Sequence, residues 1–130
     1  MLFDHLDYIY TPSRDVAADV RYFTDVLGGR LVFAIEGMGA RVAMIELTDE
    51  PPRILLADHL EGDVPILVYR VDSLAETVAT FRAAGLDVHE FGLPPGPAAR
   101  VDAPGGQPFA VYELTRPGVV EGFAGRFDED

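Results

Sequence analysis

Apolar segments alternate along the chain with polar, glycine-rich and proline-rich breaks, and the order of the segments repeats once. Residues 6–11 carry aliphatic and aromatic side chains with little polar relief, which predicts a buried strand. After a break, apolar side chains recur every three or four positions, at Val16, Val20, Phe23 and Leu27. This spacing predicts an amphipathic helix, with Ser13 or Asp15 as its cap and the glycine pair 28–29 at its end.

Three further strands are expected in the first half of the chain, at residues 30–36, 41–47 and 53–58. The Gly37-Met38-Gly39 segment predicts a hairpin turn between the first two of these strands. A polar linker, residues 59–64, then leads to the second half.

The second half follows the same order. A strand at 65–71 precedes a helix at 74–84, and three strands follow, at 86–91, 100–103 and 108–114. The segment 92–98 is expected to be a loop, because its prolines cannot donate hydrogen bonds to a sheet.

Several residue types recur at an offset of 58 positions, which indicates a degenerate internal duplication. The matched pairs are Ile9 with Leu67, Ala17 with Ala75, Val20 with Val78, and Phe23 with Phe81. We therefore expect one α+β domain, residues 1–114, made of two tandem βαβββ modules at about 5–58 and 65–114. The modules would form a curved mixed eight-stranded sheet with helices outside and a cup inside. The tail, residues 115–130, is loosely patterned and is expected to be partly disordered or to lie over a neighbouring surface.

Three segments resemble the vicinal-oxygen-chelate superfamily, which includes glyoxalases, dioxygenases and bleomycin-resistance proteins. The opening strand and helix of that family are similar to LDYIYTPSRDVAADVRYFTDVLGGRLV, with Tyr22-Phe23 and Leu27-Gly28 at its FYxxxLG positions. The opening of its second half resembles YRVDSLAETVATFRAAGLDV, and its closing turn and strand resemble APGGQPFAVYEL. The resemblance covers about residues 5–114 and implies the glyoxalase/bleomycin-resistance fold.

The resemblance also implies a divalent metal, held by two ligands from each half on the first and fourth strands. The matching positions in this chain are Tyr8, Ile66, Ala110 and the segment 54–56. Aliphatic side chains offer no lone pair, and a neutral phenol is a poor ligand for a hard cation. We therefore expect no metal site of the family type and no cofactor.

Other side chains give weaker alternatives for a metal site. The candidates for an unrecognised site are Asp58, His59 and Glu46. The other two histidines are His5, expected at a strand end, and His89, whose neighbour Glu90 points to the opposite sheet face. For each histidine a surface or hydrogen-bonded role is favoured.

Strand pleating predicts which side chains line the cup. If Tyr8 faces it, Leu6 does too. The expected ligand-binding pocket consists of Tyr8, Tyr10, Ile66, Val68, Arg70, Ala110 and Tyr112. Such an aromatic and aliphatic pocket, with phenol hydroxyls and one cation, suits a planar or amphipathic small molecule. The alternative is that these side chains simply fill the cup and that Arg70 pairs with a carboxylate.

Composition limits the partners. The 130 residues include no cysteine, which excludes disulfides and thiolate chemistry, and carry a formal net charge of −12, which disfavours nucleic acid. No signal peptide or membrane-spanning run is apparent, so we expect a cytoplasmic protein without a membrane partner. The negative charge favours solubility or, alternatively, capture of a cationic ligand.

Two classes of function fit this sequence, and the first is preferred. The first is a small-molecule-binding protein without the family metal site, which sequesters an aromatic or cationic compound as resistance proteins do and forms a homodimer. The second is a metal-dependent lyase, isomerase or dioxygenase of the glyoxalase type with an unrecognised site. A metal-free catalyst with Tyr8 or Tyr112 as acid is a third possibility, but the sequence shows no base beside either tyrosine.

Overall fold

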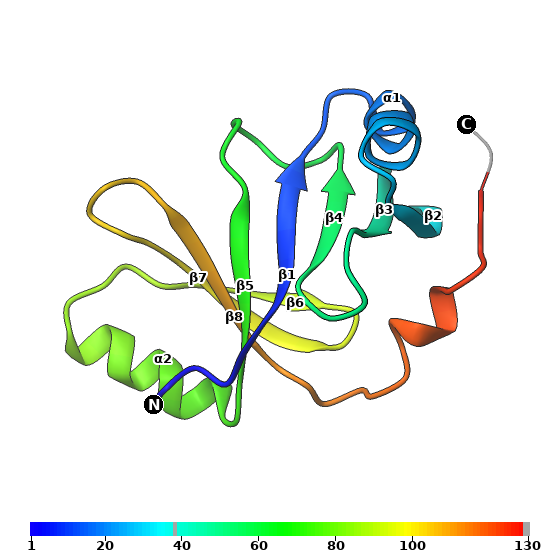
Figure 1. Ribbon diagram of the computed structural model, residues 1–130. Helices are drawn as coiled ribbons and strands as arrows, with labels where there is room; N and C mark the ends of the chain where they lie inside the picture. Colours follow the sequence, from blue (N-terminus) through cyan, green and yellow to red (C-terminus); the bar gives the residue numbers. More distant parts are fainter. Residues whose placement is uncertain (38, 129–130) are drawn as a thin grey trace.

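The computed structural model describes residues 1–37 and 39–128, and its strands form one mixed sheet (Figure 1). The strands are β1 His5–Pro12, β2 Arg30–Gly37, β3 Ala40–Glu46, β4 Arg53–Ala57, β5 Ile66–Val71, β6 His89–Leu93, β7 Gly96–Asp102 and β8 Pro108–Glu113. The helical segments are α1 Val16–Arg21, its π-helical continuation η1 Tyr22–Val26, α2 Leu74–Ala83 and a short 3-10 helix η2 Glu121–Phe123. Met38, at the predicted hairpin turn, lies outside the described residues.

The strand order shows the duplication directly. It runs β2-β3-β4-β1-β5-β8-β7-β6, so each half contributes the same sequence of strands from the centre outward. β1 and β5 pair antiparallel at the centre, and there Ile9 lies opposite Leu67, the residue matched to it by the 58-position offset. β4 joins β1 and β8 joins β5 in parallel. The predicted α+β fold of two tandem modules in a mixed eight-stranded sheet is confirmed.

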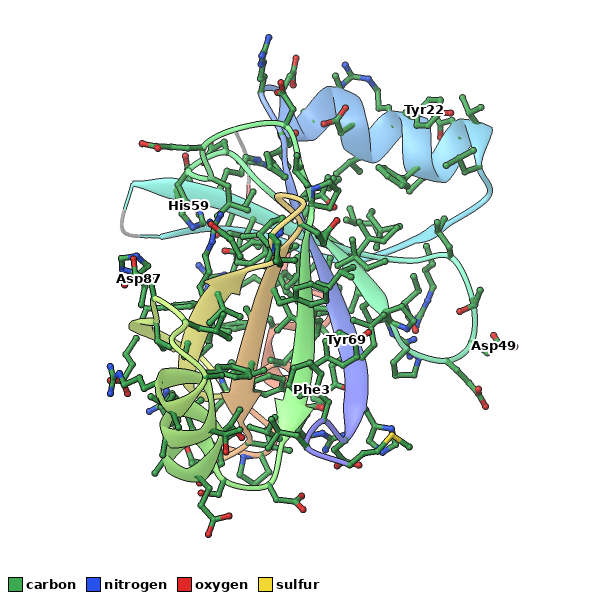
Figure 2. All side chains as sticks on the ribbon, turned by 90° about the vertical axis from the view of Figure 1, so that its left-hand side faces the viewer. Phe3, Tyr22, Asp49, His59, Tyr69 and Asp87 are labelled. Carbon is green, nitrogen blue, oxygen red and sulfur yellow. The ribbon has the colours of Figure 1, made fainter. Side chains whose placement is uncertain are left out.

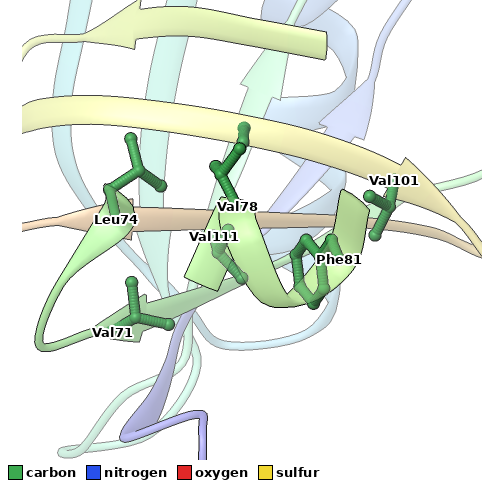
Figure 3. Close-up of a cluster of buried hydrophobic side chains, with 7 residues drawn as sticks. Val71, Leu74, Val78, Phe81, Val101 and Val111 are labelled. Carbon is green, nitrogen blue, oxygen red and sulfur yellow. The ribbon is translucent and has the colours of Figure 1, made fainter. Parts of the chain in front are cut away.

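Both helices pack on the same face of the sheet, each over its own half. Under α2, Val78 and Phe81 pack against Val101 and Val111 (Figure 3). Under α1, the buried cluster includes Ile45 and Leu56, which are fully buried. Burial of this apolar area is the main source of stability for such a layer. Among the described residues, no helix has the length and apolar character that crossing a membrane requires.

The N-terminal residues extend the core beneath α2. The Phe3 ring lies 4.9 Å from the Tyr69 ring on β5 and meets Phe81 of α2 edge to face. Figure 2 shows Phe3 and Tyr69 together near the sheet centre. The segment before β1 therefore covers part of the helix-bearing face.

The first helix begins as predicted and ends differently. At its beginning Asp15 is the cap, and the Asp15 carboxylate accepts a hydrogen bond from the Ala18 amide at 3.0 Å. In the π-helical turn, the Leu27 amide donates to the Tyr22 carbonyl at 3.2 Å. This wider turn inserts an extra residue, so Leu27, predicted on the buried stripe, is instead 46% exposed.

The segment 92–98 is not the loop that its prolines predict. β6 and β7 form a hairpin closed by Pro94 and Pro95 alone, and Pro97 lies opposite Gly92. Pro97 is tolerated because the β7–β8 ladder begins only at Ala98, so the proline serves one neighbouring strand instead of two.

The tail lies against its own chain. The Gly125 amide donates to the Val32 carbonyl at 2.9 Å, and the Ala34 amide donates to the Arg126 carbonyl at 2.9 Å. The Phe123 ring lies 5.5 Å from the Phe33 ring. The tail, orange to red in Figure 1, thus crosses from β8 to the outer edge of β2. Glu129 and Asp130 lie outside the described residues.

Candidate functional site

A β-bulge in β1 decides which side chains enter the cup. Leu6 pairs with Tyr69 and Tyr8 pairs with Val68, so Asp7 is an extra residue between two consecutive partners. Leu6 therefore shares the helix-bearing face with Tyr69 and does not line the cup as predicted. Asp7 and Tyr8 both line it. Pleating alone placed Asp7 on the wrong face, and this is why the sequence analysis missed it.

The first cavity of the cup, the polar compartment, measures about 320 Å³. Its charged and hydroxyl-bearing lining consists of Asp7, Tyr8, Glu46, Arg53, Arg70, Tyr112, Arg116 and Glu121. Three carboxylates thus face three guanidinium groups inside one cavity. Since guanidinium groups remain charged at any physiological pH, the compartment always presents cations.

Asp7 anchors one side of the polar compartment. The Tyr112 hydroxyl donates a hydrogen bond to the Asp7 carboxylate, and Nε of Arg70 lies 3.2 Å from Oδ2 of Asp7. Asp7 and Tyr112 are both buried. Burial, followed by the hydrogen bond to Asp7, raises the pKa of Tyr112 well above its usual value, so its phenol stays a neutral donor. The three side chains therefore form one polar network.

Glu46 anchors the opposite side. Nη2 of Arg53 lies 2.9 Å from Oε2 of Glu46, and Arg30 pairs with the other carboxylate oxygen. Arg53 lies directly beside Tyr8, its partner in the β1–β4 ladder. Sequence analysis missed Arg53, although alternation along β4 puts it on the same face as Leu55, two residues away.

The second cavity, the apolar compartment, measures about 110 Å³ and adjoins the first. The two compartments share Tyr8, Met44, Pro95 and Val120. The remaining lining of the apolar compartment is Tyr10, Phe33, Ile35, Val42, Leu55, Val68, Leu93, Pro94 and Phe123. The cup therefore has a charged end and an apolar end, and the two ends are continuous.

The tail and the β6–β7 turn form the rim of both compartments. Val120 of the tail lines both, and Phe123 lines the apolar one. Arg116 fastens the turn, because its Nε and Nη2 donate to the carbonyls of Pro94 and Leu93 at 2.7 Å each. Both elements were outside the predicted site.

Five of the seven predicted pocket residues line a compartment: Tyr8, Tyr10, Val68, Arg70 and Tyr112. The other two, Ile66 and Ala110, lie in the buried cluster beneath them.

Burial raises the pKa of Tyr8 and of Tyr10. The Tyr10 hydroxyl lies 3.2 Å from Nε2 of His59, and this contact fixes the hydroxyl end of the Tyr10 ring.

The alternative metal ligands are dispersed. Asp58 accepts a hydrogen bond from the Arg41 amide at 2.9 Å. His5 and His89 pair with neighbouring aspartates, and neither lines the polar or the apolar compartment. Residues 1–37 and 39–128 hold no group of three or more imidazoles, thiols or carboxylates close enough to bind a metal ion.

The four family ligand positions do not fit a divalent ion. Tyr8 offers a single phenol, which is a poor ligand for a hard divalent cation. Ile66 and Ala110 offer no donor atom, and within 54–56 the side chain that lines the cup is Leu55.

Comparisons with solved structures show what the fold is similar to. A methylmalonyl-CoA epimerase from Mycobacterium tuberculosis is 19% identical, with a TM-score of 0.74 over 92% of this chain and 93% of that chain. A variant epimerase from Streptomyces coelicolor, in complex with 2-nitronate-propionyl-CoA, is 15% identical, with a TM-score of 0.70 over 87% of this chain and 96% of that one.

A homoprotocatechuate 2,3-dioxygenase variant from Brevibacterium fuscum is 20% identical, with a TM-score of 0.65. The match covers 88% of this chain but 33% of the dioxygenase chain. By sequence, no protein-family model matches the chain and no curated protein matches it. The structural neighbours have the vicinal-oxygen-chelate fold, and this chain shares that fold.

Proposed function

We propose that this chain, which has the vicinal-oxygen-chelate fold, is a metal-free protein that binds and sequesters a small amphipathic molecule in its cup. The observation that carries the proposal is the continuity of a charged compartment and an apolar one, joined at Tyr8 and Met44. Small-molecule sites have this construction, in which apolar walls supply affinity and a few polar groups fix orientation.

The apolar compartment suits a small ring or a short hydrocarbon chain. Its volume of about 110 Å³ is somewhat smaller than the roughly 150 Å³ of an apolar cavity that takes up benzene. Phe33, Tyr10 and Phe123 supply aromatic faces and edges against which a ring can stack. One neighbour, the Streptomyces coelicolor epimerase, is in complex with 2-nitronate-propionyl-CoA, which supports a ligand-binding use of this fold.

Filling the apolar compartment tests the proposal. In Leu55→Phe the larger ring occupies the compartment, so binding of an aromatic probe should weaken by about tenfold or more. Probes are phenylacetate, phenylacetamide and 2-phenylethylammonium, followed by amide shifts in ¹H–¹⁵N spectra at millimolar concentration. The matched control is Leu86→Phe, because Leu86 is 38% exposed and does not line either compartment.

The same titrations can also refute the proposed ligand binding. If no probe shifts the amides of the cup strands, or if Leu55→Phe and Leu86→Phe bind equally well, ligand binding in the cup is refuted. A preference for 2-phenylethylammonium that disappears with added salt would support the cationic ligand suggested by the net charge of −12.

A second candidate is an enzyme, favoured by the contact between Tyr112 and Asp7. This contact puts a carboxylate beside a phenol hydroxyl in the cavity, which the sequence analysis had not found. A metal-dependent enzyme would instead retain a stoichiometric metal. Elemental analysis of dialysed protein separates a metal-dependent protein from a metal-free one, and one bound Fe, Mn, Ni or Zn per chain would overturn the metal-free proposal.

Homodimerisation belongs to the same proposal. The tail already pairs with β2 through Val32 and Ala34, so β6 is the edge strand that a partner would use. A monomeric mass in sedimentation at micromolar concentration would exclude the dimer without affecting ligand binding in the cup.

A further inference from the structure

The arginines that line the polar compartment have an excess of hydrogen-bond donors without a partner. Nη1 of Arg53 is buried and has no hydrogen-bond partner among the described residues. Nε of Arg70 is buried as well and touches only the Asp7 carboxylate, without hydrogen-bond geometry. A buried donor without an acceptor is costly and therefore uncommon.

The terminal nitrogens of Arg70 add to this excess. Within residues 1–37 and 39–128, the Arg70 side chain donates no hydrogen bond, and its ion pair with Asp7 joins Nε to Oδ2. The side chain is 33% exposed and lines the polar compartment, and it carries two terminal nitrogens. Their planar fork has the spacing that a carboxylate accepts in two parallel hydrogen bonds.

The acceptors of the compartment are, by contrast, already engaged. Asp7 faces Tyr112 and Arg70, and Glu46 faces Arg53 and Arg30. Glu121 is the exception, but its residue is exposed, so water screens its charge. What the compartment lacks is therefore an acceptor.

We propose that the polar compartment is a carboxylate subsite, in which Arg70 and Arg53 receive the acid group of an amphipathic monocarboxylate whose apolar part lies in the apolar compartment. This inference rests on the proposed function and names its ligand class. The negative net charge does not oppose it, because distant surface charges are screened beyond about 8 Å at physiological salt, whereas contacts inside the cavity are not.

The three probes of the Leu55→Phe experiment share one ring and differ in their polar group. Phenylacetate should bind about tenfold or more tightly than phenylacetamide, and 2-phenylethylammonium should bind more weakly than either. Arg70→Gln should reduce phenylacetate binding to the level of phenylacetamide and change phenylacetamide binding by less than about twofold.

The matched control is Arg82→Gln, because Arg82 pairs with Glu90 on the outer surface and should leave all three affinities unchanged. Arg53→Gln provides the second test if Arg70→Gln does not fold. Equal binding of phenylacetate and phenylacetamide, or an unchanged preference in the folded arginine variants, overturns the carboxylate subsite alone. Absence of binding by all three probes overturns it together with the proposed function.

Discussion

Asp7 shows what one inserted residue does to a site. Pleating assigns the Asp7 side chain to the helix-bearing face. The bulge instead directs it into the cup, where it lies at the centre of the polar network. Tyr8, Tyr10 and Arg70 were predictable because they obey the two-residue period. Asp7 was not predictable, because a bulge depends on how two distant strands pair and leaves no mark in the local pattern.

The hydrogen bond between Tyr112 and Asp7 should be measurable as stability. In Tyr112→Phe the buried Asp7 carboxylate loses a donor, and the free energy of unfolding should fall by about 1–3 kcal/mol. Urea denaturation measures this change. The control Tyr22→Phe, at a side chain that is 52% exposed, should change it by less than about 0.5 kcal/mol. Equal stability of the two variants would contradict the network.

At the scale of elements, the regular ones were predictable and the adjustments were not. Apolar periodicity indicated the helix at 74–84 and its packing face, which the structure places over Val101 and Val111. The π-helical turn that exposes Leu27 depends on tertiary packing. The hairpin at 92–98 was missed because a proline is excluded only where its amide would be needed, and that requirement depends on strand order.

The tail is an element whose attachment can be tested by exchange. Phe123 holds it against Phe33, and the Ala34 amide donates to the tail carbonyl of Arg126. In Phe123→Ala the amide of Ala34 should exchange with solvent faster, while amides of the β7–β8 ladder keep their rates. Hydrogen exchange followed by NMR measures both.

A nearby side chain supplies the comparison for the tail experiment. The Phe127 ring is 57% exposed, so Phe127→Ala should leave the Ala34 exchange rate nearly unchanged. If Phe123→Ala behaves in the same way, the ring contact does not hold the tail in place.

At the scale of the whole molecule, the duplication was the decisive sequence feature. The offset matched Ile9 with Leu67 as equivalent positions, and the structure pairs these two residues at the centre of the sheet. The strand order, in which each half repeats the other from the centre outward, was left open by the sequence. The boundary of the cup was less predictable, because the tail and the β6–β7 turn form its rim through contacts that carry no periodicity.

Titration of the whole protein gives another prediction. The ten basic residues are all arginines, so tyrosines dominate side-chain ionisation between about pH 9 and 12. Burial raises the pKa of Tyr8, Tyr10 and Tyr112 in the folded state. The unfolded chain releases these protons from about pH 10 while the folded chain retains them, so the contribution of the three tyrosines to stability should be constant below that pH and fall above it.

Urea midpoints across this range, with phenolate absorbance followed in parallel, measure the alkaline loss. The loss should be shallower in Tyr112→Phe, which removes one of the three shifted groups. Midpoints that stay level to about pH 11 would contradict the burial of these phenols.

The bulge at Asp7 also has a geometric consequence. A cup made of two equivalent halves would accept a guest equally well in either of two directions, related by the axis between β1 and β5. The 58-position counterpart of Asp7 is Pro65, which precedes β5, and the described pairings of the second half contain no register shift. The carboxylate and its partners therefore stand on one side of the axis only, so the cup should distinguish the head of a guest from its tail.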